Sequence, residues 1–120
     1  MNHWLSGVTS FMEFTEVFAR GVEGVDPLSP SEAAWFRFTI FEIFKVAEDM
    51  HFQHDEGILD AAQWNGWRWV FAQYLASPGG RSFWEVGNEA FSPRFNAFYQ
   101  SLQPSSTFKR GGALLEPRTP

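Results

Sequence analysis

The motif SPSE at residues 29–32 most constrains the fold of this chain, because it marks the start of a long helix. Ser29 can cap the helix, the proline suits the first helical position, and the Glu32 carboxylate can reach back to the Ser29 amide. The helix is predicted to run from the proline to about Glu56, with Gly57 suited to its end. A helix of roughly 27 residues is about 40 Å long.

Apolar residues lie on several faces of this predicted helix. One face carries Ala33, Phe36, Arg37, Ile40, Phe41, Phe44, Ala47 and His51, and much of the remainder is covered by Trp35, Phe38, Ile43 and Val46. A helix that is apolar on several faces is typical of the centre of a helical protein. The sequence therefore predicts that the other elements pack around this helix.

Four more helices are predicted from the spacing of apolar residues and from capping residues. They cover about residues 4–20, 61–76, 80–91 and 93–103. Asp60 and Ser92 are suited to cap the helices that follow them, and the segment SPGG at residues 77–80 is read as a turn. No stretch has the alternating pattern of a strand. We therefore expect an all-α fold, a compact bundle of about five helices with a long central helix.

The chain is expected to form one domain, residues 1–103, followed by a flexible and disordered C-terminal tail, residues 104–120. The tail is rich in Pro, Gly, Ser and Thr and lacks helical periodicity. Because it has no periodic apolar residues to pack, we expect the domain to fold without it.

The aromatic content is high, with 14 Phe, 6 Trp and 2 Tyr in 120 residues. A domain of this size has limited interior, so some of these rings are expected at the surface, against a partner. The net charge of −5 argues against non-specific binding to nucleic acid. The absence of cysteine fits a cytoplasmic protein. No run of about 18 apolar residues predicts a transmembrane helix, although peripheral contact with the inner face of a membrane stays open.

The segment EDMHFQHDEG at residues 48–57 is a candidate metal site. On a helix, Glu48 and His51 share a face, and His54 follows three residues after His51. A di-iron bundle would need a second Glu-x-x-His unit, which the sequence lacks. The alternative is a polar helix end without a metal, and the sequence indicates no cofactor. A metal-dependent enzyme using Glu48 and His51 is the weakest of three functional hypotheses.

Glu48 is also a candidate buried polar anchor. It follows apolar residues on the central helix, and a buried carboxylate needs hydrogen-bond donors. The expected donors are the guanidinium groups of Arg37, Arg68 and Arg81 and the indole N–H groups of the tryptophans.

A ligand pocket lined by aromatic rings is a further hypothesis. Its candidate residues, which would bind an apolar or aromatic small molecule, are Trp64, Trp67, Phe71, Arg81 and Trp84. The same rings could equally form the core, and the glycines before Arg81 could serve a tight turn rather than an anion site.

Several features together resemble a family of uncharacterised bacterial proteins. The matching features are Glu48, Gln53, Gly57, Asp60, Trp64, the turn at residues 78–81, Trp84 and the segment FSPRF at residues 91–95. These proteins are small all-helical domains that commonly follow one N-terminal transmembrane helix. The resemblance covers about residues 11–102, and it implies an all-α fold without an established activity. This chain departs from the family in lacking that membrane helix.

The leading functional hypothesis is a non-enzymatic interaction or structural module that associates with itself or with another protein. Because no membrane segment would cover the first helix, we expect its apolar residues to form the interface of a homodimer. The candidate interface residues are Trp4, Leu5, Val8 and Phe11, with a contribution from the start of the second helix.

Overall fold

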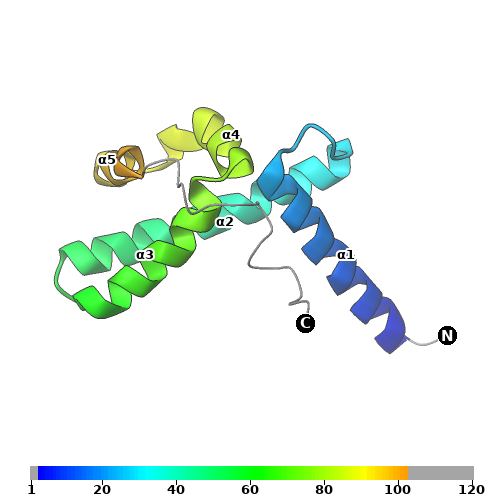
Figure 1. Cartoon of the computed structure of the whole chain (residues 1–120), viewed down its shortest axis with the longest axis horizontal. Coiled ribbons are helices and arrows are strands. Elements are labelled where there is room, and N and C mark those ends of the chain that lie inside the picture. The colour runs from blue at the N-terminus through cyan, green and yellow to red at the C-terminus, as the bar shows by residue number, and fades with distance from the viewer. Residues whose placement is uncertain (1–2, 103–120) are drawn as a thin grey trace, which may run out of the picture.

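The computed structural model describes residues 3–102, with side chains from residue 11 onward, and confirms the all-α prediction (Figure 1). The elements are α1 (His3–Glu23), α2 (Pro30–Asp55), α3 (Ala61–Leu75), α4 (Pro78–Gly87), the 3₁₀ turn η1 (Asn88–Ala90) and α5 (Pro93–Ser101). No strand is present among residues 3–102. The predicted tail, residues 104–120, lies outside the described residues.

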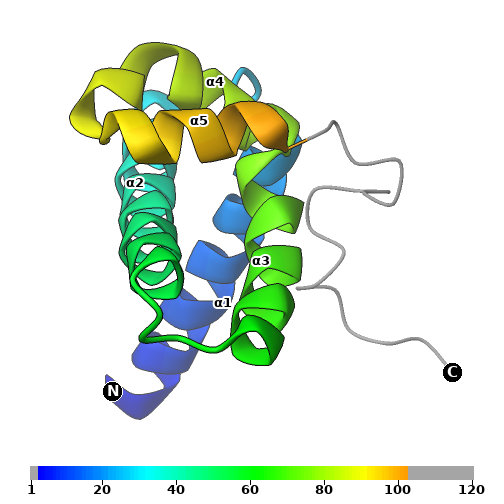
Figure 2. The same cartoon turned by 90° about the vertical axis from the view of Figure 1, so that its left-hand side faces the viewer.

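Helix α2 is the longest helix of the bundle and lies at its centre, as the sequence predicted. Helices α2 and α3 lie side by side, and α4 and α5 lie across one end of this pair (Figure 2). The buried face of α2 contributes Ala33, Phe36, Ile40, Phe44 and Ala47 to the core. The other helices cover this face with Phe18, Val22, Trp64, Phe71, Leu75, Trp84 and Phe95.

Serine and aspartate side chains start the helices as expected from the sequence. The Ser29 hydroxyl accepts a hydrogen bond from the Glu32 amide, and the Glu32 carboxylate accepts one from the Ser29 amide, which completes the capping box. Asp60 caps α3 and Ser92 caps α5 in the same manner, each accepting from the amide three residues later.

The prediction for the start of α4 was wrong. The SPGG segment is not a separate turn, because α4 begins at Pro78 and Ser77 is its N-cap. The Ser77 hydroxyl accepts a hydrogen bond from the Gly80 amide at 2.9 Å. Helix α4 ends at Gly87, and η1 takes up residues that were assigned to the helix. Two adjacent glycines are poor helix formers, which explains why the sequence pattern placed the start too late.

Helices α1 and α4 cross at a pair of glycines. A Cβ atom on Gly79 would overlap the carbonyl oxygen of Gly21, and one on Gly21 would overlap the ring of Phe36. The crossing therefore requires residues without side chains at both positions. This contact fixes the C-terminal half of α1 against the bundle.

The N-terminal half of α1 extends away from the other helices (Figure 1). We call residues 3–14 of this helix the α1 arm. The arm contributes to the elongated outline of the molecule, whose principal extents are 51 × 31 × 29 Å. Of its described apolar side chains, Phe11, Met12 and Phe14 are exposed, whereas Phe18 and Val22 of the C-terminal half are buried.

Candidate functional site

An apolar stripe runs along α1 and passes from the covered half of the helix to the arm. The stripe comprises Phe11, Phe14, Phe18 and Val22, which recur every three or four residues. Phe18 and Val22 are buried in the core, whereas Phe14 is 50% exposed and Phe11 is 72% exposed. The face that packs against the bundle thus continues, uncovered, onto the arm.

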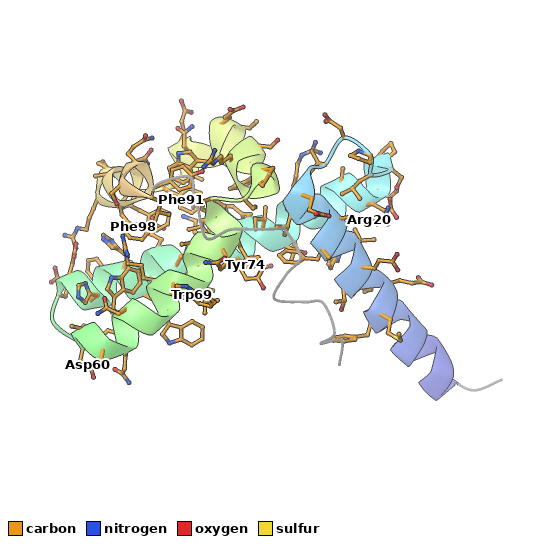
Figure 3. All side chains as sticks on the ribbon, viewed as in Figure 1. Arg20, Asp60, Trp69, Tyr74, Phe91 and Phe98 are labelled. Carbon is orange, nitrogen blue, oxygen red and sulfur yellow. The ribbon has the colours of Figure 1, made fainter. Side chains whose placement is uncertain are left out.

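Trp35 lies where the stripe meets the body of the protein. Its ring stacks on Phe14, with ring centroids 5.1 Å apart, and meets Phe18 edge to face. Phe18 also contacts Tyr74, which lies on the side of α3 that faces α1 (Figure 3). Trp35 therefore joins the last covered part of the stripe to the outer surface of α2.

An open groove of about 400 Å³ begins at Trp35 and follows α2 and α3. We call it the α2–α3 groove, and its lining consists of Trp35, Phe38, Thr39, Glu42, Ile43, Val46 and Phe71. Phe38 and Val46 are exposed, and the exposed ring of Trp67 stacks on Phe71. The groove is therefore an extension of the apolar surface that starts on α1.

The sequence contains a signal for this groove in the apolar residues of α2. Trp35, Phe38, Ile43 and Val46 cover much of α2 outside its first apolar face, and this distribution predicts a central position for the helix. The structure places α2 centrally but leaves Phe38 and Val46 in contact with solvent. Apolar spacing shows which residues share a face, but not whether another helix covers that face.

Both carboxylate oxygens of Glu48 are engaged. Oε1 accepts from Lys45 Nζ at 3.1 Å, and Oε2 accepts from the Ser92 amide at 2.8 Å. The side chain is partly buried, with 21% of its surface exposed. Lys45 also donates to the Ala90 carbonyl oxygen at 2.7 Å and lies over the ring of Phe91. Glu48 thus links α2 to the start of α5.

The donors to Glu48 differ from those expected. The predicted donors were Arg37, Arg68, Arg81 and the indole N–H groups of the tryptophans. Lys45 and a backbone amide take that role instead. A general base at Glu48 would have to give up one of these bonds to reach a substrate. The arrangement is that of a structural link between two helices.

His51 and His54 lie against aromatic rings. His51 packs on Phe98, with ring centroids 4.6 Å apart, and His54 stacks on Trp64 at 5.5 Å. Phe98 lies between α5 and α3 (Figure 3). Desolvation in this setting lowers the pKa of His51 below its ordinary value of 6.5, against the opposing effect of Asp55.

The candidate metal ligands do not form a ligand cluster. Glu48 is directed to Lys45 and Ser92, and His51 is directed to the aromatic rings. Within the part of the chain that the structure describes, no group of three or more His, Cys, Asp or Glu side chains is placed to hold a metal ion. The geometry gives a metal-dependent reaction no support.

The five residues proposed for an aromatic ligand pocket are distributed over different parts of the fold. Trp64 is buried beside His51 and Phe98, and Trp84 is buried between Phe44 and Tyr99. Phe71 lines the α2–α3 groove, beside Trp67. Arg81 borders a separate groove of about 270 Å³, next to Trp84. Of this set, Phe71 and Trp67 belong to the apolar surface described above.

The predicted interface residues fall largely outside the described side chains. Trp4, Leu5 and Val8 lie in α1, but the structure describes no side chain before residue 11. Phe11 is described, and it is the most exposed member of the α1 stripe.

Comparison of the chain with protein-family models, with curated proteins and with solved structures finds no match. None of the helices among the described residues is long and apolar enough to span a membrane. The function is therefore inferred from the exposed apolar surface and the side-chain contacts described above.

Proposed function

We propose that this protein is a non-enzymatic interaction module that associates with itself through the apolar surface of the α1 stripe and the α2–α3 groove. The observation that carries the proposal is the continuity of this surface from Phe11 through Trp35 to Val46. Large contiguous apolar surfaces on small proteins mark binding sites, because their exposure to water is unfavourable.

The scarcity of charged residues in the lining of the α2–α3 groove fits a binding role better than a catalytic one. Glu42 is the one charged residue in the lining of the α2–α3 groove. A groove with a single charged residue offers little acid–base chemistry but a large area for an apolar contact. We place the module in the cytoplasm, which the absence of cysteine favours, and we retain the likeness to the bacterial helical family as part of the proposal.

Light scattering on the purified chain tests self-association. The expected mass at micromolar concentration is twice the monomer mass of 13.8 kDa. Phe11→Glu places a charge in the apolar surface and is expected to weaken association at least about tenfold, a change of about 1.4 kcal/mol. Because Phe11 is exposed, the variant should keep its helical circular dichroism spectrum.

The matched control is Val86→Glu, which changes another highly exposed apolar residue, on α4 and outside this surface. It should associate like the parent. A parent protein that remains a monomer at all concentrations would refute self-association. Equal association of the Phe11→Glu variant and a dimeric parent would refute the assignment of the contact to this surface.

A second candidate function is the binding of an apolar small molecule in the α2–α3 groove. Its volume of about 400 Å³ lies in the range of ligand pockets, and its lining is mainly apolar. An apolar fluorescent dye should then bind with a single site, and Phe38→Glu should abolish that binding. Saturable dye binding by a strictly monomeric protein would favour this function over self-association.

A further inference from the structure

We infer that the partner on this surface is a second copy of the chain, and that each copy inserts its α1 arm into the α2–α3 groove of the other. The inference rests on the proposed function and adds the occupant of the groove. A helix is the shape that such a groove between two helices accommodates.

The lengths of the arm and of the groove agree. Residues 3–14 of α1 form about 18 Å of helix, and the groove lining from Trp35 to Val46 spans about 16 Å along α2. One arm therefore covers the length of one groove.

The arm presents its apolar side without bringing acidic groups into the groove. On a helical projection, Glu13 and Glu16 lie about 140° and 160° away from Phe18, on the side opposite the stripe. Inserting Phe11 therefore leaves both carboxylates in solvent, so that Glu42 of the groove faces no acid of the arm.

The arm cannot fill the groove of its own chain as a continuous helix. The glycine crossing at Gly21 and Gly79 and the burial of Phe18 fix the direction of α1. Phe14 stacks on Trp35 at one end of the groove of its own chain, and from there the arm extends away from α2 and α3 (Figure 1). A second copy supplies a groove for the arm and an arm for the groove in one contact. The twofold arrangement covers two arms and two grooves at once, and it closes without further growth.

The exposed aromatic rings supply a large share of the area that a stable contact needs. Phe38 is 65% exposed and Trp67 is 48% exposed, in addition to the exposed fractions of Phe11 and Phe14. With roughly 200 Å² for a large aromatic side chain, these four rings expose on the order of 450 Å² per copy. A standard interface buries about 800 Å² on each partner, so four side chains supply more than half of that area.

Cross-linking between two single-cysteine variants tests the arrangement, because the chain contains no cysteine of its own. One variant is Met12→Cys, on the exposed arm, and the other is Val46→Cys, in the groove lining. The two variants carry tags of different size, are mixed and equilibrated, and are treated with a short bismaleimide. The expected product is a cross-link between the two differently tagged chains.

The matched control replaces the groove variant by Val86→Cys, which is exposed on α4 outside the groove. The inference predicts a severalfold higher yield for the arm–groove pair than for this control. Equal yields from a protein that is dimeric by light scattering would overturn the arm-in-groove arrangement and leave self-association standing. A protein that is monomeric by light scattering would overturn both.

Discussion

The Glu48 carboxylate and the Ser92 amide, 44 residues apart in the sequence, are joined by a hydrogen bond of 2.8 Å. Ser92 is the N-cap of α5, and its amide is one of the groups that a helix start leaves without a partner. In the capping box of α2 that partner is Glu32, three residues after the cap. The corresponding residue of α5 is Phe95, whose side chain has no hydrogen-bond acceptor. Glu48 of α2 therefore accepts from the Ser92 amide instead.

Glu48→Ala should destabilise the protein by about 1–3 kcal/mol, because the Ser92 amide and the Lys45 ammonium group would both lose a partner. Glu48→Gln keeps an acceptor for the amide and should cost less. Chemical unfolding of both variants measures the difference. Glu85→Ala, an exposed position on α4, serves as the control and should change stability by less than about 0.5 kcal/mol. Equal stability of Glu48→Ala and the parent would contradict the structural role.

Gly79→Ala should destabilise the protein by about 3 kcal/mol or more, because the new methyl group would force α4 away from the Gly21 carbonyl. Gly66 provides a matched control in the interior of α3, where a Cβ atom meets no atom within 4 Å. Gly66→Ala should stabilise the protein by about 0.5–1 kcal/mol, since alanine favours a helix. Thermal unfolding of the two variants measures the loss of stability expected for Gly79→Ala and the gain expected for Gly66→Ala. A tolerated Gly79→Ala would show that the two helices can separate at little cost.

Stability should fall as the pH is lowered through 6.5. Desolvation lowers the pKa of His51 in the folded protein, with His54 and Arg94 acting in the same direction and Asp55 opposing them. Below pH 6.5 the unfolded chain therefore binds a proton at His51 more readily than the folded chain does, and the free energy of unfolding decreases. Above pH 6.5 this contribution to stability is fully present.

Urea unfolding at a series of pH values, with the parent and His51→Phe, measures this dependence. The variant keeps a ring against Phe98 and removes the titrating group, so its stability should depend less on pH between 5 and 7. A histidine NMR titration should place the pKa of His51 below 6.5. A value above 6.5 would contradict the burial of this ring.

At alkaline pH the protein should lose stability as the pH rises above about 10. Desolvation raises the pKa of Tyr99 to about 12, so the unfolded chain loses the phenolic proton before the folded chain does. Tyr99 also donates a hydrogen bond to the Leu75 carbonyl oxygen at 3.2 Å. Tyr99→Phe should therefore cost about 1 kcal/mol at neutral pH and reduce the alkaline loss.

The measurement is a pH titration of phenolate absorbance in the folded parent, together with unfolding of Tyr99→Phe at neutral and alkaline pH. Burial also raises the pKa of Tyr74, so part of the alkaline dependence should persist in the variant. Normal titration of both tyrosines would contradict their packing in the core.

The sequence by itself determined the helices and most of their starts, because capping and periodicity act over three or four residues. Ser29 with Glu32, Asp60 and Ser92 each satisfy an amide within their own turn, so their roles can be read locally. The apolar residues on several faces of α2 were visible for the same reason.

Tertiary structure alone decided the contacts between distant residues. The start of α4 was misplaced because the glycines that weaken its helical pattern are required where α1 crosses it, at Gly21 and Gly79. The partner of Glu48 was missed because Ser92 comes close only when α5 packs on α2. Phe11 and Phe18 are seven residues apart and so share a face of the helix, but the direction of α1 decides that Phe18 is buried and Phe11 is exposed. Burial depends on which helices meet in space, and that follows from packing of the whole chain rather than from local spacing.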